Sequence, residues 1–276
     1  VHNLLEIRVA TIDGELLAYS TGVFGPGVTT RLSGDPQMLI WTAAGCRTIA
    51  KQQSMLVSET CDGGDRRTVT LGPDDAIRQM ETGSEGLYAV HKDGSVTVWD
   101  ERLATLLEAP APPNDAIRYS TGAVFDVSAK SLYAIETDND LVLAFRAGDT
   151  QWRGIAGNDE PVRALALGRA GVIYLGFEQR GAVRAVDLAT GRTLFETVLP
   201  KGQYVGRITP SPDGRHLYVT AMTNRHSLFK LDAVSGALAA DEFNRFSGPA
   251  HVLAISPDGR YLALSGVGAP DGKAAI

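Results

Sequence analysis

The chain has 276 residues, 44% of them hydrophobic, and carries a formal net charge of −6 with a pI near 5.4. This balance disfavours nucleic acid and anionic membranes as partners, and no apolar run approaches the length of a membrane span. A chain of this size can bury a core of its own, so we expect residues 1–276 to form a single domain.

The first third of the chain predicts strands without a regular repeat. Residues 4–12 have strong β character, lack a preceding partner, and end in Asp13-Gly14. Two further strands are expected at 38–43 and 46–51. We expect a hairpin over residues 54–71 to be inserted after them, with Asp62-Gly63-Gly64-Asp65 at its tip.

Beyond this region the sequence repeats. A phrase of apolar-Tyr-apolar residues returns at spacings of 45, 41 and 44 residues, in copies that begin at Leu87, Leu132, Ile173 and Leu217. An alternating apolar run follows each copy after about ten residues, and Ser-Pro-Asp-Gly-Arg occurs at 211–215 and again 45 residues later at 256–260. Short strands and tight turns at this period predict an all-β fold, a β-propeller of four-stranded blades.

The period also predicts the number of blades and the way the ring closes. We name the strands of a blade A to D in chain order, which makes 38–43 and 46–51 strands B and C of the first blade. With a period near 44, 276 residues correspond to six blades; the alternative gives residues 55–60 a blade of their own, making seven. The last blade has strands A and B within 251–264, and strand 4–12 is expected to complete it and close the ring. The alternative is that strand 4–12 belongs to a blade outside this chain.

Two residue types recur at fixed blade positions and are predicted to be structural. The tyrosines of the repeated phrase are expected to pack in the core; they are Tyr88, Tyr133, Tyr174 and Tyr218. An aspartate follows strand C in three blades, at Asp100, Asp187 and Asp232, and is expected to cap the following turn through its side chain.

The two cysteines, Cys46 and Cys61, are 15 residues apart in the same predicted blade. They can face each other across a hairpin, and we expect a disulfide, which implies an oxidising compartment. The alternative is a pair of small apolar residues in a cytosolic protein. No histidine lies within four residues of either cysteine, so a metal site at the cysteines is not expected.

The repeats carry a family resemblance over about residues 77–264. Ser-Pro-Asp-Gly-Arg-His-Leu-Tyr-Val-Thr (211–220) and Ala-Val-Arg-Ala-Val-Asp-Leu-Ala-Thr-Gly-Arg (182–192) resemble the repeats of YVTN-type bacterial propellers, and are similar to the quinoprotein-like propellers of exported bacterial proteins. Gly-Ser-Val-Thr-Val-Trp-Asp (94–100) resembles the end of a WD40 repeat. The resemblance implies the fold and an extracytoplasmic setting, periplasmic or secreted. The tryptophan-docking motifs of quinoprotein alcohol dehydrogenases are absent, since the only tryptophans are Trp41, Trp99 and Trp152.

Candidate site residues come from the loops that join strands B to C and those that join strand D to the next strand A. These loops converge on one side of a propeller, around its central channel, and function concentrates in such loops. We take as ligand-binding candidates His91, Asp138, Arg180, Tyr204, Arg207 and Arg225, and as candidate catalytic groups His226, His251, Glu136 and Glu178. The A–B turns at Asp213-Gly214 and Asp258-Gly259 are expected on the opposite side, with a structural role.

Three functions are compatible with this pattern. The first is an exported module that binds a protein or a small-molecule ligand on the channel face, and it requires no catalytic motif. The second is a lactonase-like or lyase-like enzyme that uses carboxylates and histidine, with a divalent cation. The third is a quinoprotein-like redox subunit. We favour the binding module and expect no resident cofactor or metal.

Overall fold

A computed structural model describes the chain over residues 6–11, 16–20, 38–42, 45–52, 54–60, 64–71, 77–82, 87–112, 123–136, 141–157, 160–200, 204–221, 228–239, 250–255, 259 and 261–266. Across these ranges every regular element is a β-strand, apart from the short 3-10 turn η2 (Arg169–Gly171). No helix in this part of the chain has the length and hydropathy needed to cross a membrane. The all-β class predicted from the repeat is confirmed.

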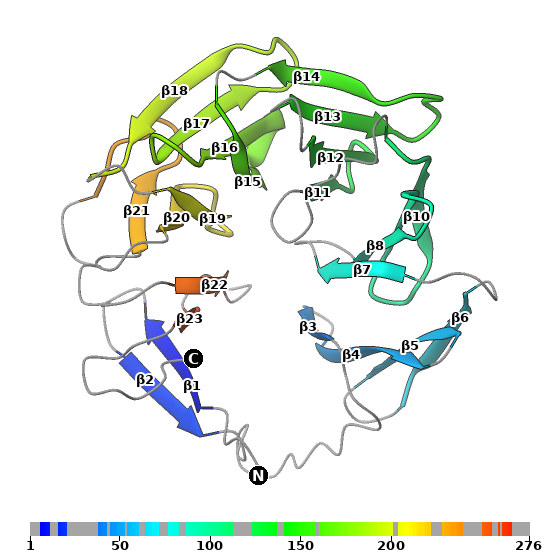
Figure 1. The fold of residues 1–276 in the computed structure, drawn as a ribbon. Helices are drawn as coiled ribbons and strands as arrows, with labels where there is room; N and C mark the ends of the chain where they lie inside the picture. Colours follow the sequence, from blue (N-terminus) through cyan, green and yellow to red (C-terminus); the bar gives the residue numbers. More distant parts are fainter. Residues whose placement is uncertain are drawn as a thin grey trace. The chain divides into compact units, whose positions relative to one another are not determined.

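The described strands form six sheets, each built mainly from strands that are consecutive in the chain (Figure 1). Two sheets come early: β3 (Met38–Thr42), β4 (Gly45–Gln52), β5 (Met55–Thr60) and β6 (Arg66–Thr70); then β7 (Ile77–Thr82), β8 (Leu87–His91), β9 (Val96–Trp99) and β10 (Thr105–Ala109). Two more follow: β11 (Ala123–Asp126), β12 (Ser131–Ile135), β13 (Leu141–Arg146) and β14 (Arg153–Gly157); then β15 (Val162–Leu167), β16 (Val172–Phe177), β17 (Ala182–Asp187) and β18 (Thr193–Val198). The fifth holds β19 (Val205–Pro210), β20 (His216–Ala221) and β21 (Leu228–Asp232), and the sixth β22 (Ala250–Ile255) and β23 (Tyr261–Gly266) with β1 (Glu6–Thr11) and β2 (Leu16–Ser20).

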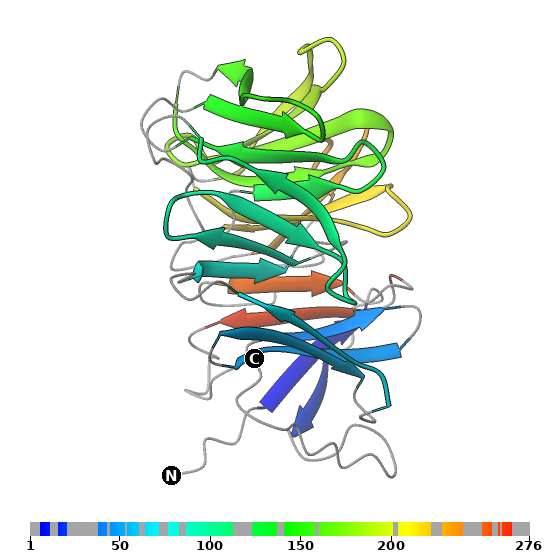
Figure 2. The same ribbon diagram turned by 90° about the vertical axis from the view of Figure 1, so that its right-hand side faces the viewer.

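The N-terminal strand completes the last sheet, as the sequence predicts. β1 runs antiparallel to β23, with Val9 opposite Ala263 and Thr11 opposite Tyr261. β2, which sequence analysis missed, extends the sheet beyond β1. Figure 2 shows this sheet from the side, with β1 and β2 in dark blue and β23 in red. The number of blades in the full ring, and its closure, stay predictions.

The assignment of the first blade was wrong by one strand. Residues 38–42 are the first strand of their sheet and 45–52 the second, so they correspond to strands A and B, whereas B and C were expected. The hairpin 54–71 is no insertion, because β5 pairs with β4 along its whole length and β6 pairs with β5. Leu56 and Val57 of β5 are buried, and this burial is what places the hairpin in the sheet.

The chain separates into two compact units, which we describe one at a time. The first contains Val1–Val28, Asn139–Val142 and Ile155–Ile276, and the second contains Thr29–Asp138 and Leu143–Gly154. In the second unit a core of Ile49, Leu56, Leu71, Leu87, Ala89, Trp99 and Leu103 lies between β3–β6 and β7–β10. In the first unit a core fills the space between β15–β18 and β19–β21, where it includes Val183, Val205, Leu217 and Val219.

The recurring tyrosines are core residues, which confirms their predicted packing role: Tyr88, Tyr133, Tyr174 and Tyr218 are all at most 8% exposed. Tyr174 on β16 also reaches the next sheet, where its hydroxyl donates a hydrogen bond of 3.0 Å to the carbonyl of Ala233. The two sheets approach closely here. A Cβ added to Gly176 would lie 2.4 Å from a methyl carbon of Val205, so only glycine fits.

Candidate binding surface

One group of predicted loops is well defined in the first unit, at a single end of the sheet β15–β18. It comprises the loop between β16 and β17 (residues 178–181), the residues just before β15 (Glu160 and Pro161) and the residue just before β19 (Tyr204). The amide of Glu178 donates to the carbonyl of Pro161 at 3.0 Å, and the amide of Leu199 donates to the carbonyl of Gly181 at 2.9 Å. The B–C loop is therefore tied by its backbone at both ends, to the entry of β15 and to the exit of β18.

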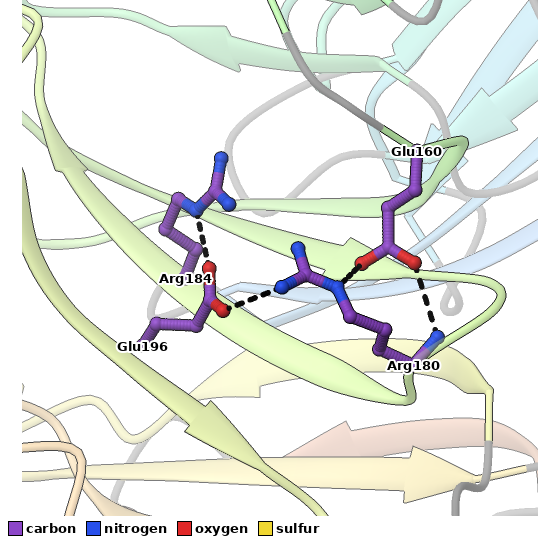
Figure 3. A network of polar contacts seen from close by, with 4 residues as sticks. All are labelled: Glu160, Arg180, Arg184 and Glu196. Atoms are coloured by element: carbon purple, nitrogen blue, oxygen red, sulfur yellow. Dashed lines mark hydrogen bonds and ion pairs between the residues drawn. The ribbon is translucent and has the colours of Figure 1, made fainter.

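A buried carboxylate fixes the middle of this loop. Glu160 is 4% exposed, and its two oxygens accept from the backbone amide of Arg180 at 3.0 Å and from Nε of the same residue at 2.7 Å. Figure 3 shows the two residues facing each other across the loop. Burying a carboxylate is costly unless it is paired and hydrogen-bonded, and Arg180 satisfies both conditions.

A second carboxylate joins Arg180 to Arg184 of β17. One oxygen of Glu196 on β18 accepts from Nη1 of Arg180 at 3.1 Å, and the other accepts from Nε of Arg184 at 2.7 Å (Figure 3). Glu196 lies directly opposite Arg184 in the β17–β18 register, which brings the two side chains together. The carboxylate thus spans two arginines, one oxygen to each.

Both guanidinium groups also lie over one aromatic ring. The Cζ atom of Arg184 is 4.7 Å from the ring centroid of Phe177, and that of Arg180 is 5.7 Å from the same centroid. Phe177 ends β16 and is fully buried. Cation–π attraction to a buried ring therefore supports the positions of both arginines independently of their carboxylates.

A second cluster involves Glu178 of the same loop. Nη1 of Arg163, on β15, is 3.2 Å from a carboxylate oxygen of Glu178, and both side chains are a little over one third exposed. The Cζ atom of Arg163 also lies 5.1 Å from the ring centroid of Tyr204. Arginine and tyrosine are the residue types enriched in binding hot spots. This cluster therefore adds a partly exposed contact surface at the same end of the sheet.

Three predicted candidates are brought together here, namely Glu178, Arg180 and Tyr204. Sequence analysis did not single out Glu160, Arg163, Arg184, Glu196 or Phe177. Strand alternation places Arg184 and Glu196 in half-buried strands, but their contact depends on the β17–β18 register, which no local sequence signal supplies.

The remaining candidates lie elsewhere in the chain, and the structure describes only some of them. His91 in the second unit contacts its own sheet, with Nε2 2.8 Å from Oγ1 of Thr97 and its ring edge-on to Trp99. Glu136, also in the second unit, is 4% exposed, and Arg207 is half-buried on β19. His251 lies on β22, where only the backbone is defined. Asp138, Arg225, His226 and Cys61 lie outside the described residues, so their predicted roles, including the disulfide with Cys46, stay predictions.

The A–B turn at Asp213-Gly214, at the opposite strand ends, is structural, as expected, whereas Asp258 of the second predicted turn lies outside the described residues. In the A–B turn before β20, one Asp213 oxygen accepts from Oγ of Ser211 at 2.5 Å and from the amide of Arg215 at 3.0 Å. Gly214 has φ +68°, a conformation that favours glycine. Arg169 of the preceding sheet donates from Nη2 to the carbonyl of Pro212 at 2.5 Å. These contacts stabilise the turn and join it to the neighbouring sheet, which is a structural role.

The recurring aspartates cap the C–D turns. Oδ1 of Asp187 accepts from the hydroxyl and the amide of Thr190, each at 2.7 Å, and Asp232 accepts from the hydroxyl and amide of Ser235 in the same way. These hydrogen bonds hold the pKa of both carboxyl groups below the ordinary value of 3.8. Asp100 likewise accepts from the amides of Arg102 and Ala104. The predicted capping role is confirmed.

The charged groups of the candidate surface are paired with one another. Glu160 and Glu196 each accept charged hydrogen bonds from arginine, so their oxygens are engaged. Among the residues whose positions are defined, no three histidine, cysteine or acidic side chains gather in a way that could hold a metal ion. Paired, pre-positioned charges beside a half-exposed Arg–Tyr contact are typical of binding surfaces.

Comparisons with known proteins identify the fold. No protein-family model and no curated protein matches the sequence. A chain from the crystal structure of a mitotic checkpoint complex matches with a TM-score of 0.60 and 16% identity, over 98% of this chain and 80% of that one. A chain of hydrazine synthase from Kuenenia stuttgartiensis matches with a TM-score of 0.56 and 18% identity, over 89% of this chain and 77% of that one. Both are propeller-containing structures, and at these identities the likeness shows the fold alone: the chain is an all-β protein of the β-propeller class.

Proposed function

We propose that this chain is a propeller scaffold that binds a partner protein. The partner would contact the surface formed by Arg163, Glu178, Tyr204 and the Arg180–Arg184–Glu196 network, which we call the arginine surface. The observation that carries the proposal is the way this surface is held in advance. Buried Glu160 holds Arg180, and buried Phe177 lies under both Arg180 and Arg184, so these two side chains have little entropy left to lose when a partner binds.

The composition of the arginine surface supports a protein partner. Arg163 and Tyr204 are stacked and partly exposed, and Val198, on the outermost strand β18 of the sheet that carries Arg163, is 58% exposed. Arginine, tyrosine and exposed aliphatic area are all components of protein interfaces. One of the structural neighbours comes from a multi-protein assembly, the mitotic checkpoint complex, which agrees with a propeller used as a binding scaffold.

We also propose that the protein works outside the cytoplasm, in the periplasm or as a secreted protein. The support is the resemblance of its repeats to those of exported bacterial propellers, together with Cys46 and Cys61 in one predicted blade. Neither argument involves the arginine surface, so the setting and the binding role can be tested separately.

The binding proposal is tested by affinity capture from the source cells with quantitative mass spectrometry. Wild-type protein is compared with Arg163→Ala and Tyr204→Ala, and with Arg192→Ala as the matched control. Arg192 is an exposed arginine in the C–D turn of the same sheet, at the opposite strand ends. We expect a partner whose recovery falls about tenfold with either surface variant, as for a hot-spot residue worth about 1.4 kcal/mol, and is unchanged by Arg192→Ala. If every captured protein is recovered equally by all four forms, the proposal is wrong.

A further inference from the structure

The most specific feature of the arginine surface is the position of Glu196. Its carboxylate lies between two guanidinium groups, with one oxygen 3.1 Å from Nη1 of Arg180 and the other 2.7 Å from Nε of Arg184. Two guanidinium groups that hold one carboxylate have the chemistry of a carboxylate-binding site. Here the carboxylate is supplied by the chain itself, from the outermost strand of the sheet.

The two arginines do not depend on Glu196 for their positions. Arg180 is held by Glu160 through Nε and through its backbone amide, and both guanidinium groups lie over the buried ring of Phe177. We call Arg180 and Arg184, with the Phe177 ring beneath them, the two-arginine fork. Glu160 and Phe177 would keep this fork in place if the Glu196 carboxylate moved away.

The charges favour replacement by another carboxylate. Glu160, Arg180, Arg184 and Glu196 together carry two positive and two negative charges, which cancel; without the Glu196 carboxylate one positive charge remains. The Glu196 side chain is 26% exposed and that of Arg180 is 42% exposed, so solvent reaches the pair from outside. Phe195 and Thr197 turn toward the next sheet, where both lie against Gly236, which leaves Glu196 and exposed Val198 on the other face of β18.

We propose that Glu196 is a built-in occupant of a carboxylate site, and that an acidic segment of the partner protein replaces it on the two-arginine fork. This inference rests on the proposed function, because it assigns the chemistry of the partner at the same surface. A tethered carboxylate competes at an effective concentration on the order of millimolar. A simple anion is therefore excluded from the wild-type fork, whereas a partner that also contacts Arg163 and Tyr204 has the additional affinity needed to displace Glu196.

The test uses a fluorescent hexaglutamate peptide as the probe and follows its anisotropy at about 20 mM and 150 mM salt. Wild-type protein is compared with Glu196→Gln, which removes the competing charge, and with the double variant Glu196→Gln/Arg184→Gln. Glu196→Ala serves as a second form of the first variant, and circular dichroism confirms that each form is folded. The matched control is Glu59→Gln, which removes a carboxylate that lies 3.9 Å from Arg66 in the other unit.

We expect Glu196→Gln to bind the peptide at least about tenfold more tightly than wild type at low salt, with a smaller gain at high salt because the charges are screened. The double variant should lose this gain, and Glu59→Gln should show none. The proposal is overturned if neither folded Glu196 variant gains affinity, or if Glu59→Gln gains as much, since the effect would then follow net charge alone. The two proposals can fail separately. If partner capture does not depend on Arg163 and Tyr204, the proposed binding function is wrong, but the peptide result for the two-arginine fork still holds.

Discussion

Glu160 is the residue on which the shape of the arginine surface depends most. Its carboxylate is 4% exposed and accepts two hydrogen bonds, both from Arg180, so it ties the B–C loop to the entry of β15. The perturbation with the least change in shape is Glu160→Gln, which removes the charge and replaces one accepting oxygen by an amide that cannot accept.

The cost of this change follows from the exposure of the two partners. Removing one member of a fully buried ion pair costs about 3–5 kcal/mol, because the other charge stays buried. Here the side chain of Arg180 is 42% exposed, so water solvates it after the change and the cost falls well below that range. We expect Glu160→Gln to reduce the free energy of unfolding by about 1–2 kcal/mol and Glu160→Ala by about 2–3 kcal/mol.

The measurement is urea unfolding followed by circular dichroism, with the slope m compared between forms to confirm that the same surface is exposed. The matched control is Glu178→Gln on the same loop, because the Glu178–Arg163 pair has both side chains more than one third exposed. Glu178→Gln should lower the free energy of unfolding by less than about 0.5 kcal/mol. If Glu160→Gln is no more destabilising than Glu178→Gln, burial of the Glu160 carboxylate does not organise the loop and the reasoning is wrong.

Three further predictions concern packing, pH and the cysteines. Gly176→Ala should destabilise the protein by about 1–3 kcal/mol in urea unfolding, because its Cβ would lie 2.4 Å from Val205; an unchanged midpoint would contradict the close approach of the two sheets. The Thr190 hydroxyl and amide hold the pKa of Asp187 below 3.8, so its contribution to stability is complete above that pH and is lost as the pH falls through the lowered pKa. Asp187→Asn should therefore be less stable than wild type at pH 6, with the difference closing toward pH 2.5, and a gap that is constant with pH would refute the assignment. Finally, we expect Cys46 and Cys61 to be joined, because they are the sequence neighbours of Arg47 and Thr60, which pair with each other between β4 and β5; two free thiols in unfolded, unreduced protein would exclude the bond.

Much of the fold was determined by local sequence patterns. Tyr174 and Tyr218 occupy the same position in corresponding strands, and Asp187 and Asp232 precede the same kind of turn, so each repeat specifies its strands without reference to the rest of the chain. Even the pairing of the N-terminal strand with β23 followed from two unmatched strands at the chain ends. The first blade was misassigned because residues 38–60 lack the Tyr and Asp-Gly phrases that mark strand positions, and burial of Leu56 and Val57 decided the pairing in their place.

The candidate surface was only partly accessible from the sequence. Arg180, Glu178 and Tyr204 were identified because blade topology sends the B–C and D–A loops to one side, and that rule needs only the repeat. The contacts that give the surface its chemistry depend on tertiary structure. Arg184 meets Glu196 only through the β17–β18 register, and Glu160 meets Arg180 across 20 residues of chain. Strand periodicity specifies which face of the sheet a side chain occupies. The register of the paired strands decides which charged residue lies opposite that side chain, so the two arginines around one carboxylate could be recognised only in the folded sheet.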